Sequence, residues 1–375
     1  MNIAINTDPM DKTRTGIGNY TKSLVTSLLN VDKKNKYYLI HYNKSSHPIY
    51  NLGNEVKIKM VPIPPKKILT DIIKLPGLLK GIDLIHFTLP SVSNNISSIK
   101  LRNNKIMTIH DLGFMSYSRP KIYLRPSEWA FYSSLIYSLK KVIYHLPLII
   151  AVSKNTKNDI IRYLNYPENR IRVVYEASDN RFRRLDTMLE NPIGHSFILC
   201  VNLPPLNFIK TYYKYKHMGG ADKLVITGHV KFRDQKKRLF GLITDLGLQE
   251  DIVLTGHVSD EELVYLYNSA NLFVFPSLYE GFGLPPLEAM ACGCPVIASD
   301  TTSLPEVVGN AGILISPYDI DGWARAMNEV SNNNGLRQDL INRGFKRAKM
   351  FSWEKAAKET CKVYEEVNDM DFKRL

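Results

Sequence analysis

The sequence predicts an α/β protein of two domains, each built around a mainly parallel sheet. The chain has 375 residues, which is more than one typical domain holds. Short apolar runs of strand length alternate along it with segments of helical periodicity. Hydrophobic residues make up 44% of the sequence, enough to form a substantial core in each domain.

The first domain is expected over residues 1–180. Its strands are predicted at 3–6, 37–42, 56–61, 84–87, 106–109, 148–152 and 171–174, and its helices at 19–30 and 157–164. Ser153 is the expected N-cap of the second helix. A glycine turn over 13–18 carries Gly16 and Gly18 and joins the first strand to the first helix. Such a turn can bind phosphate or serve tight packing, and alone it does not decide between them.

The second domain is expected over residues 181–350. The segment 179–196, at its start, has no apolar periodicity and is the expected hinge between the domains. Strands are predicted at 197–201, 224–227, 251–255, 272–275, 296–299 and 313–315, and helices at 235–246 and 260–270. Ser259 is the expected cap of the helix at 260–270. The last segment, 351–375, contains a predicted helix, which we expect to pack back toward the first domain.

Positive charge is concentrated in the first half of the chain. Residues 1–180 contain 26 Lys and Arg against 12 Asp and Glu, a net charge of +14, and the remaining residues carry −1. This asymmetry indicates a polyanionic partner, either nucleic acid or an anionic membrane surface. The segments 64–80 and 118–141 mix basic residues with apolar or aromatic ones, which favours the membrane, and no nucleic-acid partner is expected. A solvated basic face is the alternative.

The sequence carries no signal for secretion or for a membrane span. The N-terminus is predicted as a strand, and the most apolar segment, 142–152, is too short to cross a bilayer. Cys200, Cys292, Cys294 and Cys361 lack a disulfide or zinc spacing and are expected to be free thiols. We therefore expect a cytoplasmic protein that can lie on the inner face of the cytoplasmic membrane.

His110 and Asp111 follow a predicted strand, at the sheet edge where α/β proteins place ligand-binding groups. A binding role is one interpretation of this pair. Asp111 could instead cap a turn while His110 fills a gap in the core. The residues alone leave both interpretations open.

The most informative stretch is 271–300, NLFVFPSLYEGFGLPPLEAMACGCPVIASD. A glycine loop and a helix lie between two predicted strands, so the stretch forms a βαβ unit whose helix N-terminus can bind an anion. Glu280 in the loop and Glu288 in the helix flank that site. Sugar hydroxyls at one carboxylate and ribose hydroxyls at the other, with phosphates between them, would fit.

Together these segments resemble the family 4 retaining glycosyltransferases, which have the GT-B fold, two Rossmann-like domains facing each other across a cleft. Glu280 and Glu288 match the family's E-x7-E pattern. The likeness covers nearly the whole chain, in the segments TGIGNYTKSLV at 15–25, TIHDL at 108–112, IIAVSKNTKNDI at 149–160, LTGHVSDEELVYLYNSANLFVFP at 254–276, SLPEVVGNAGILISP at 303–317 and FSWEKAAKET at 351–360.

The resemblance implies a role for each candidate residue. His110 would contact the transferred sugar near its reacting carbon, Glu280 would hold sugar hydroxyls, and Glu288 would hold the nucleotide ribose. The donor sugar and diphosphate would be bound by backbone N–H groups, namely those of Gly16, Phe282, Gly283 and Leu284. The implied reaction moves a hexose from a nucleotide-diphosphate sugar to a lipid-linked or polysaccharide acceptor, as in cell-envelope glycan synthesis.

The resemblance also implies the stereochemistry and the cofactor requirement. The anomeric configuration would be retained, with the donor phosphate taking the acceptor's proton. No metal or other cofactor is expected, because the helix dipole and basic groups would offset the charge of the leaving diphosphate.

One departure from the family pattern lies after the first strand of the second domain, where members have a glycine and then an Arg and a Lys that bind the diphosphate. Asn202 stands at the glycine position, and Pro205 and Leu206 fall near the cation pair. Lys210 or Lys231 could substitute. The loss favours an alternative function, a catalytically weakened GT-B protein that binds partners in glycan assembly. A nucleotide-sugar epimerase on the same fold is disfavoured, because the motifs belong to transferases.

Overall fold

The computed structural model describes residues 1–11, 16–41, 56–60, 77, 79–91, 101, 103–116, 126–186, 193–228 and 233–370, without the side chains of 8, 11, 41, 56–60, 126–129 and 233–235. The chain divides into unit 1, formed by Met1–Glu176 with Ser352–Leu375, and unit 2, formed by Ala177–Phe351. Most of the predicted basic segment at 64–80, the first part of the one at 118–141, and Lys231 lie outside the described residues.

Unit 1 is organised around a parallel sheet with the strand order β3-β2-β1-β4-β5-β6-β7. The strands are β1 (Asn2–Asn6), β2 (Lys36–His41), β3 (Val56–Met60), β4 (Leu84–Phe87), β5 (Asn104–Ile109), β6 (Leu148–Ala151) and β7 (Ile171–Val173). Helices cover both faces, so β4 and β6 are buried along their whole length; β6 is a continuous apolar run, and β4 is apolar except for His86.

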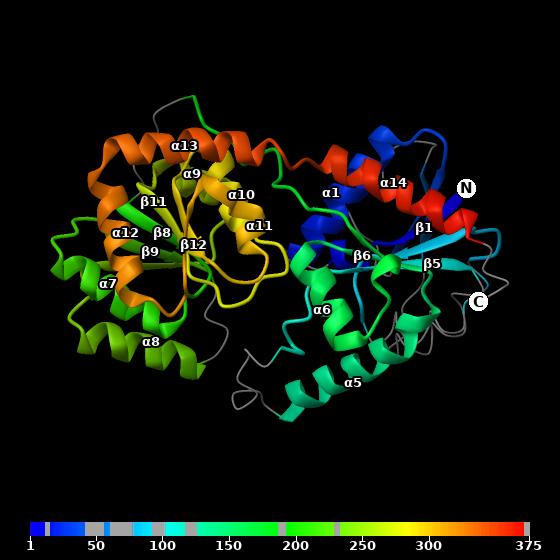
Figure 1. Cartoon of the computed structure of the whole chain (residues 1–375), viewed down its shortest axis with the longest axis horizontal. Coiled ribbons are helices and arrows are strands. Elements are labelled where there is room, and N and C mark those ends of the chain that lie inside the picture. The colour runs from blue at the N-terminus through cyan, green and yellow to red at the C-terminus, as the bar shows by residue number, and fades with distance from the viewer. Residues whose placement is uncertain are drawn as a thin grey trace. The chain divides into compact units, whose positions relative to one another are not determined.

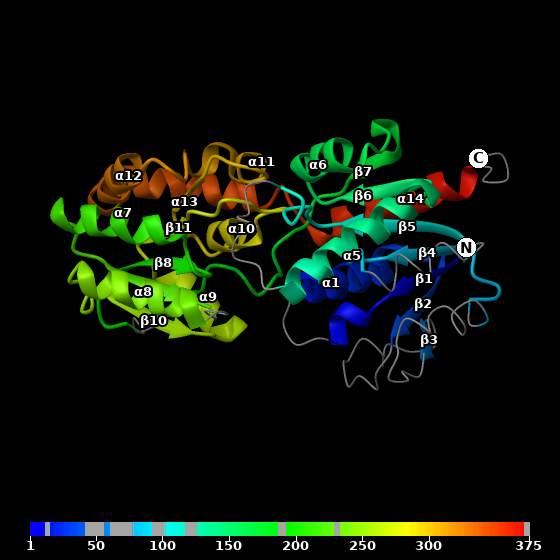
Figure 2. The ribbon, with the colours of Figure 1, turned by 90° about the horizontal axis from the view of Figure 1, so that it is seen from below.

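The helices of unit 1 come from both ends of the chain. They are η1 (Asp8–Asp11), α1 (Gly16–Val31), α5 (Pro126–Val142), η4 (Ile143–His145), α6 (Lys154–Leu164), η5 (Glu168–Arg170) and α14 (Trp353–Asp369). Figure 1 shows α1 and α14 side by side on one face of the sheet, and Figure 2 shows α5 lying across the other. The last helix therefore completes the first sheet's cover, and its residues are far in sequence from the strands they pack on.

The glycine turn predicted over 13–18 is wrong at Gly16 and Gly18, because α1 already begins at Gly16. Glycine weakens a helix without preventing one. Burial of the following face, which includes Tyr20, Leu24 and Val25, favours continuing the helix through both glycines. Residues 13–15 lie outside the described part.

Unit 2 contains a second parallel sheet, with the strand order β10-β9-β8-β11-β12-β13. The strands are β8 (Phe197–Val201), β9 (Lys223–Thr227), β10 (Ile252–Gly256), β11 (Leu272–Phe275), β12 (Val296–Ser299) and β13 (Ile313–Ile315). Alternate residues face opposite cores: Ile198 and Cys200 lie in one, and Phe197 and Leu199 lie in the other. Burial on both faces explains why the central strands β8 and β11 are continuous apolar runs.

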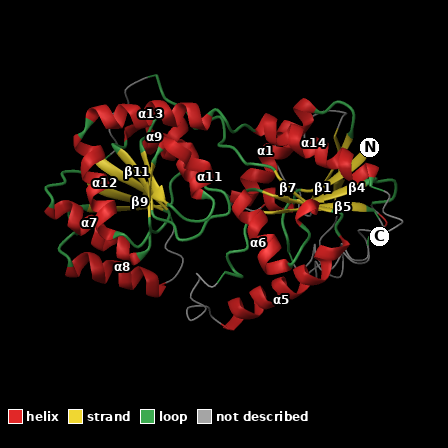
Figure 3. Ribbon diagram, in the orientation of Figure 1, coloured by secondary structure: helices red, strands yellow, loops and turns green. Residues whose placement is uncertain are grey.

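The helices of unit 2 surround this sheet, as Figure 3 shows. They are α7 (Leu206–His217), α8 (Arg233–Asp245), α9 (Asp260–Ser269), α10 (Leu284–Ala291), α11 (Leu304–Val308), η6 (Gly309–Ala311), α12 (Ile320–Asn332) and α13 (Asn334–Ala348). The predicted caps are confirmed. The hydroxyl of Ser153 accepts a hydrogen bond from the backbone of Thr156, and Ser259 forms a capping box with Glu262.

Candidate functional site

The loop between β11 and α10 holds Glu280 by its side chain and its backbone. The Ser277 hydroxyl donates to Glu280 Oε1 at 2.7 Å, and the Glu280 backbone N–H donates to Thr302 Oγ1 at 3.1 Å. Thr302 itself has a left-handed backbone, with φ of 54°. A non-glycine residue in this conformation is strained, so the surrounding contacts define the loop closely.

Gly283 and its neighbours form the turn into α10. Gly283 has φ of 113°, and a Cβ added there would lie 2.8 Å from Leu304 Cδ2, so glycine is needed for both reasons. Phe282 is buried, and its carbonyl accepts a hydrogen bond of 2.6 Å from the Ser303 hydroxyl. Leu284 begins α10 and is followed by Pro285 and Pro286, which have no N–H, so Leu284 and Leu287 carry the N–H groups of the first helical turn. The turn can therefore receive an anion.

Glu288 lies one turn into α10, against Tyr267 of α9. The Tyr267 hydroxyl, which is fully buried, donates to Glu288 Oε2 at 3.2 Å. Burial raises the pKa of the Glu288 carboxyl to about 7, although the Tyr267 hydrogen bond acts in the opposite direction. The charges of Asp260 and Asp179 raise this pKa further, and Arg181 lowers it.

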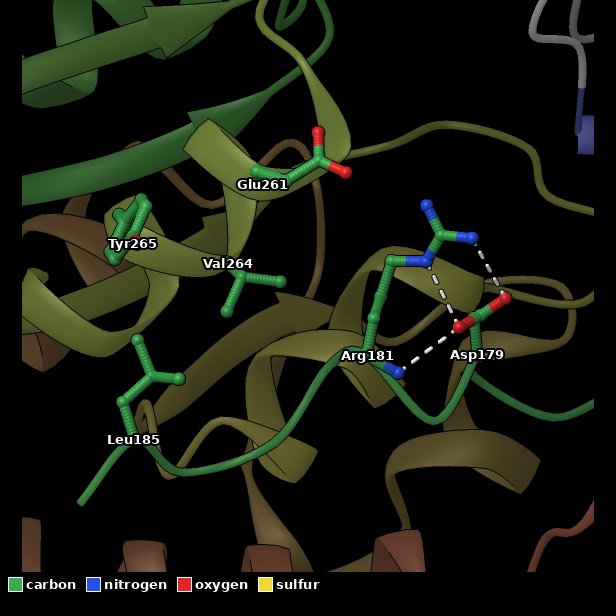
Figure 4. Close-up of a pocket in the computed structure, with 6 residues that line it drawn as sticks. All are labelled: Asp179, Arg181, Leu185, Glu261, Val264 and Tyr265. Atoms are coloured by element: carbon green, nitrogen blue, oxygen red, sulfur yellow. Dashed lines mark hydrogen bonds and ion pairs between the residues drawn. The ribbon is translucent and has the colours of Figure 1, made fainter.

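Arg181 is engaged by two other carboxylates. Its Nε donates to Asp179 at 2.9 Å and its Nη1 donates to Asp260 at 2.5 Å. Figure 4 shows Arg181 and Asp179 joined at one end of an open cavity of about 420 Å³. The cavity is lined by Asp179, Arg181, Leu185, Glu261, Val264 and Tyr265. Because the guanidinium is shared in this way, Glu288 keeps the raised pKa that its burial imposes.

In unit 1, His110 lies just after β5 with both ring nitrogens engaged. Its Nδ1 is 2.9 Å from Glu176 Oε1, and its Nε2 is 2.9 Å from the carbonyl oxygen of Thr88. Tyr20 of α1 packs on the ring at right angles, with 4.5 Å between the ring centres. Burial lowers the pKa of His110, but the hydrogen bond and charge of Glu176, with smaller contributions from Thr88 and Asp111, outweigh it, so the pKa lies above its ordinary value.

A second buried histidine, His86 on β4, connects this site to the C-terminal helix. His86 Nδ1 is 2.8 Å from the Tyr364 hydroxyl, and Nε2 is 2.8 Å from Thr108 Oγ1, which in turn lies 3.2 Å from the Tyr20 hydroxyl. Burial and the charge of His110 lower the pKa of His86 to about 3. Tyr364 of α14 is therefore linked through His86 and Thr108 to the aromatic ring that packs on His110.

The remaining predicted residues fall as follows. Gly16 is the exposed first residue of α1. Asp111 accepts a hydrogen bond of 2.8 Å from the backbone of Gly113, the turn-capping contact that was its structural alternative. The predicted free thiols are confirmed at Cys200, Cys292, Cys294 and Cys361.

Residues 208–347 match the family described as "Glycosyl transferases group 1", and residues 15–180 match "Glycosyltransferase Family 4". The chain belongs to the family 4 glycosyltransferases. O-antigen chain mannosyltransferase B of Escherichia coli is 29% identical over 391 residues, covering 97% of this chain and 99% of that protein. This glycosyltransferase thus aligns with that relative over essentially the full length of both.

Solved structures confirm the predicted GT-B fold. Sucrose-phosphate synthase from Thermosynechococcus elongatus superposes with a TM-score of 0.75 at 19% identity, covering 98% of each chain. HepE from Anabaena, in complex with UDP-glucose, superposes with a TM-score of 0.74 at 16% identity, covering 98% of this chain and all of that one (100%). At these identities the likeness concerns the fold alone.

The departure at 202–206 has a clear structural form in this glycosyltransferase. Asn202 has φ of 67°, the left-handed conformation that a glycine would adopt and that asparagine tolerates. The helix α7 begins at Leu206, so the connection from β8 is only 202–205 and the expected cation positions coincide with the helix start. Lys210 is exposed on α7. The comparisons give no support to the alternative of a weakened, binding-only protein.

Several residues around the candidate site escaped the sequence analysis, notably Tyr267, Ser277, Thr302 and Glu176. Glu176 was within reach, because it follows β7 at the same sheet edge as His110. Tyr267, Ser277 and Thr302 carry no such positional signal.

Among the described residues no group of His, Cys, Asp and Glu is arranged to hold a metal ion. The described helices also include none with the length and hydrophobicity of a membrane span.

Proposed function

We propose that this glycosyltransferase moves a hexose, with mannose the first to test, from a nucleotide-diphosphate sugar to a lipid-linked or polysaccharide acceptor. The observation that carries the proposal is the pair of glutamates on one βαβ unit, with Glu280 fixed in the loop and Glu288 partly buried on the helix. The full-length relative from Escherichia coli is named a mannosyltransferase, which supports the choice of sugar.

Each side chain has a distinct task in this proposal. Glu280, held by Ser277, accepts hydrogen bonds from sugar hydroxyls. Glu288 accepts them from the ribose, and the backbone N–H groups of Phe282, Gly283 and Leu284 receive the sugar and phosphate oxygens. In unit 1, His110 contacts the sugar near its reacting carbon, and Gly16 offers its N–H to the diphosphate.

The proposed reaction retains the anomeric configuration and needs no metal. The donor phosphate takes the proton of the acceptor hydroxyl, and the bond between sugar and diphosphate breaks as the new glycosidic bond forms on the same face. Hydrogen-bond donors and the dipole of α10 stabilise the charge of the leaving diphosphate.

A thermal-shift screen against UDP-, GDP-, ADP- and dTDP-sugars tests the donor, followed by transfer assays with lipid-linked and oligosaccharide acceptors. We expect stabilisation by one nucleotide class and transfer that persists in EDTA, with an NMR spectrum of the product that shows retention. Glu288→Ala should lose the stabilisation, whereas the exposed Glu329→Ala on α12 should keep it. Stabilisation without transfer to any acceptor would instead support the binding-only alternative.

We also propose that unit 1 binds an anionic membrane surface through α5. In the cell this surface would be the inner face of the cytoplasmic membrane. Phe131 and Tyr137 are 56% and 66% exposed on this helix, and Lys140 and Lys141 close its last turn. Exposed aromatic rings beside lysines match the chemistry of an anionic interface. The net charge of +14 over residues 1–180 adds long-range attraction.

A further inference from the structure

The hydrogen-bond partners of His110 determine which of its ring atoms carry protons. The carbonyl oxygen of Thr88 can only accept, so Nε2, at 2.9 Å, must donate. The carboxylate of Glu176, at 2.9 Å from Nδ1, also accepts. Both ring nitrogens then carry a proton, and the ring is an imidazolium paired with a carboxylate.

His86 provides an internal contrast on the neighbouring strand. Its two partners, Tyr364 and Thr108, are hydroxyls, and each can donate or accept. A neutral ring with one proton satisfies both, and burial with a nearby positive charge lowers the pKa of His86 to about 3. His86 on β4 and His110 just after the paired strand β5 therefore differ in charge, because His110 faces obligate acceptors and His86 faces hydroxyls.

The groups around His110 act together on its charge. Glu176 and Asp111 are negative and favour the imidazolium, whereas His86 lies close enough to interact but is neutral. Tyr20, on α1, keeps its proton because burial raises its pKa. Among the described residues, Glu176 is the one carboxylate bonded to the ring.

The ring is also held in orientation. Thr156 Oγ1, at the start of α6, donates to the His110 carbonyl at 3.0 Å, and Tyr20 packs at right angles to the ring. The side chain of His110 is 12% exposed and that of Glu176 is 6% exposed. The ring of His110 therefore keeps a small exposed part, and the carboxylate is covered more completely.

We propose that His110 works as a fixed imidazolium and that Glu176 is the positioning residue that keeps it charged and oriented for the transfer step. This rests on the proposed contact between His110 and the donor. Because both nitrogens are already committed to protein acceptors, His110 does not take a proton from the acceptor hydroxyl. It supplies positive charge to a sugar diphosphate, in a chain that lacks the usual cations at Pro205 and Leu206.

The charge state is tested without substrate, by NMR of the full chain with ring-labelled histidine. We expect His110 to show protons on both nitrogens at pH 7 and to titrate above its ordinary pKa of 6.5, with His86 neutral from pH 5 to 8. In Glu176→Gln the titration of His110 should move to lower pH, because only the Thr88 hydrogen bond and the charge of Asp111 then oppose the effect of burial. A neutral His110 ring at pH 7 in the wild type would overturn the proposal.

The positioning role is tested by kinetics on the same variants. Glu176→Gln should lower kcat by roughly 10²-fold with a smaller change in KM, and the loss of activity at high pH should begin at lower pH. Glu176→Asp should recover part of kcat, and the exposed Glu168→Gln should match the wild type.

Failure of the positioning role can be distinguished from failure of the proposed function. If His110 is doubly protonated in the wild type but Glu176→Gln has unchanged kinetics, the positioning role is refuted and the glycosyltransferase reaction is not affected. Absence of transfer by the wild type with every donor would remove the proposed function, and the positioning role with it. If Glu176→Gln does not fold, the wild-type titration and the kinetics of Glu176→Asp still decide.

Discussion

Replacing Glu288 with glutamine should make the protein more stable at high pH and weaken its binding of nucleotide. The folded-state pKa of Glu288 is raised from 4.5 to about 7, so the folded state prefers the protonated carboxyl. The stability that this preference contributes is fully present below about pH 4.5 and is lost as the pH rises through 7. Above that range the folded protein holds an ionised carboxylate in a partly buried site.

The magnitude follows from the shift. A shift of one pKa unit corresponds to about 1.4 kcal/mol, so a shift from 4.5 to about 7 corresponds to roughly 3 kcal/mol. Glutamine has nearly the same shape and cannot ionise. Glu288→Gln should therefore match the wild type near pH 4.5 and exceed its free energy of unfolding by roughly 3 kcal/mol at pH 8.

Urea unfolding at a series of pH values measures this difference, with the buried Trp323 as a fluorescent reporter in unit 2. Calorimetry with nucleoside diphosphates at pH 8, where Glu288 is ionised, should show the opposite effect, because a neutral amide then replaces a charge-assisted acceptor for the ribose. A loss of ~1.5–3 kcal/mol, or roughly 10- to 100-fold in Kd, is expected. An equal difference in stability between Glu288→Gln and the wild type at both pH values would refute the reasoning, because it would show that folding does not change the pKa of Glu288.

Three further changes test other parts of the molecule. Gly283→Ala should destabilise unit 2 by roughly 1–3 kcal/mol, because its φ is 113° and the new methyl group would meet Leu304 at 2.8 Å; Gly241→Ala, with open space around it, should be stable in urea by comparison. Tyr364→Phe should cost about 1–3 kcal/mol, because it leaves Nδ1 of the buried His86 without its partner, and an unchanged urea midpoint would contradict that contact. Phe131→Ser with Tyr137→Ser should reduce binding of the full chain to anionic vesicles several-fold, whereas Phe240→Ser, an exposed ring of unit 2, should not; equal binding to anionic and neutral vesicles by the wild type would sink the membrane proposal.

The regular elements of both sheets could be predicted because the inner strands are covered on two faces. Leu272 to Phe275 and Val296 to Ser299 are buried throughout, so the sequence records them as unbroken apolar runs. The caps at Ser153 and Ser259 were predictable for a related reason, since a cap depends on neighbours three residues away. The start of α1 at Gly16 was not predictable, because packing of the helix outweighs the low helix propensity of glycine.

The two-domain α/β class, the family, and the two glutamates with seven residues between them could all be predicted from the sequence. These predictions depend on local pattern and spacing, which can be identified without knowledge of the fold. Only the tertiary structure showed that Tyr267 bonds Glu288, that Glu176 bonds His110, and that Tyr364 of the last helix bonds His86. These partners are 21, 66 and 278 residues apart in the chain. Protonation depends on burial and on such distant partners, so the charges of Glu288 and His110 follow from the fold and are not legible in either residue's own segment.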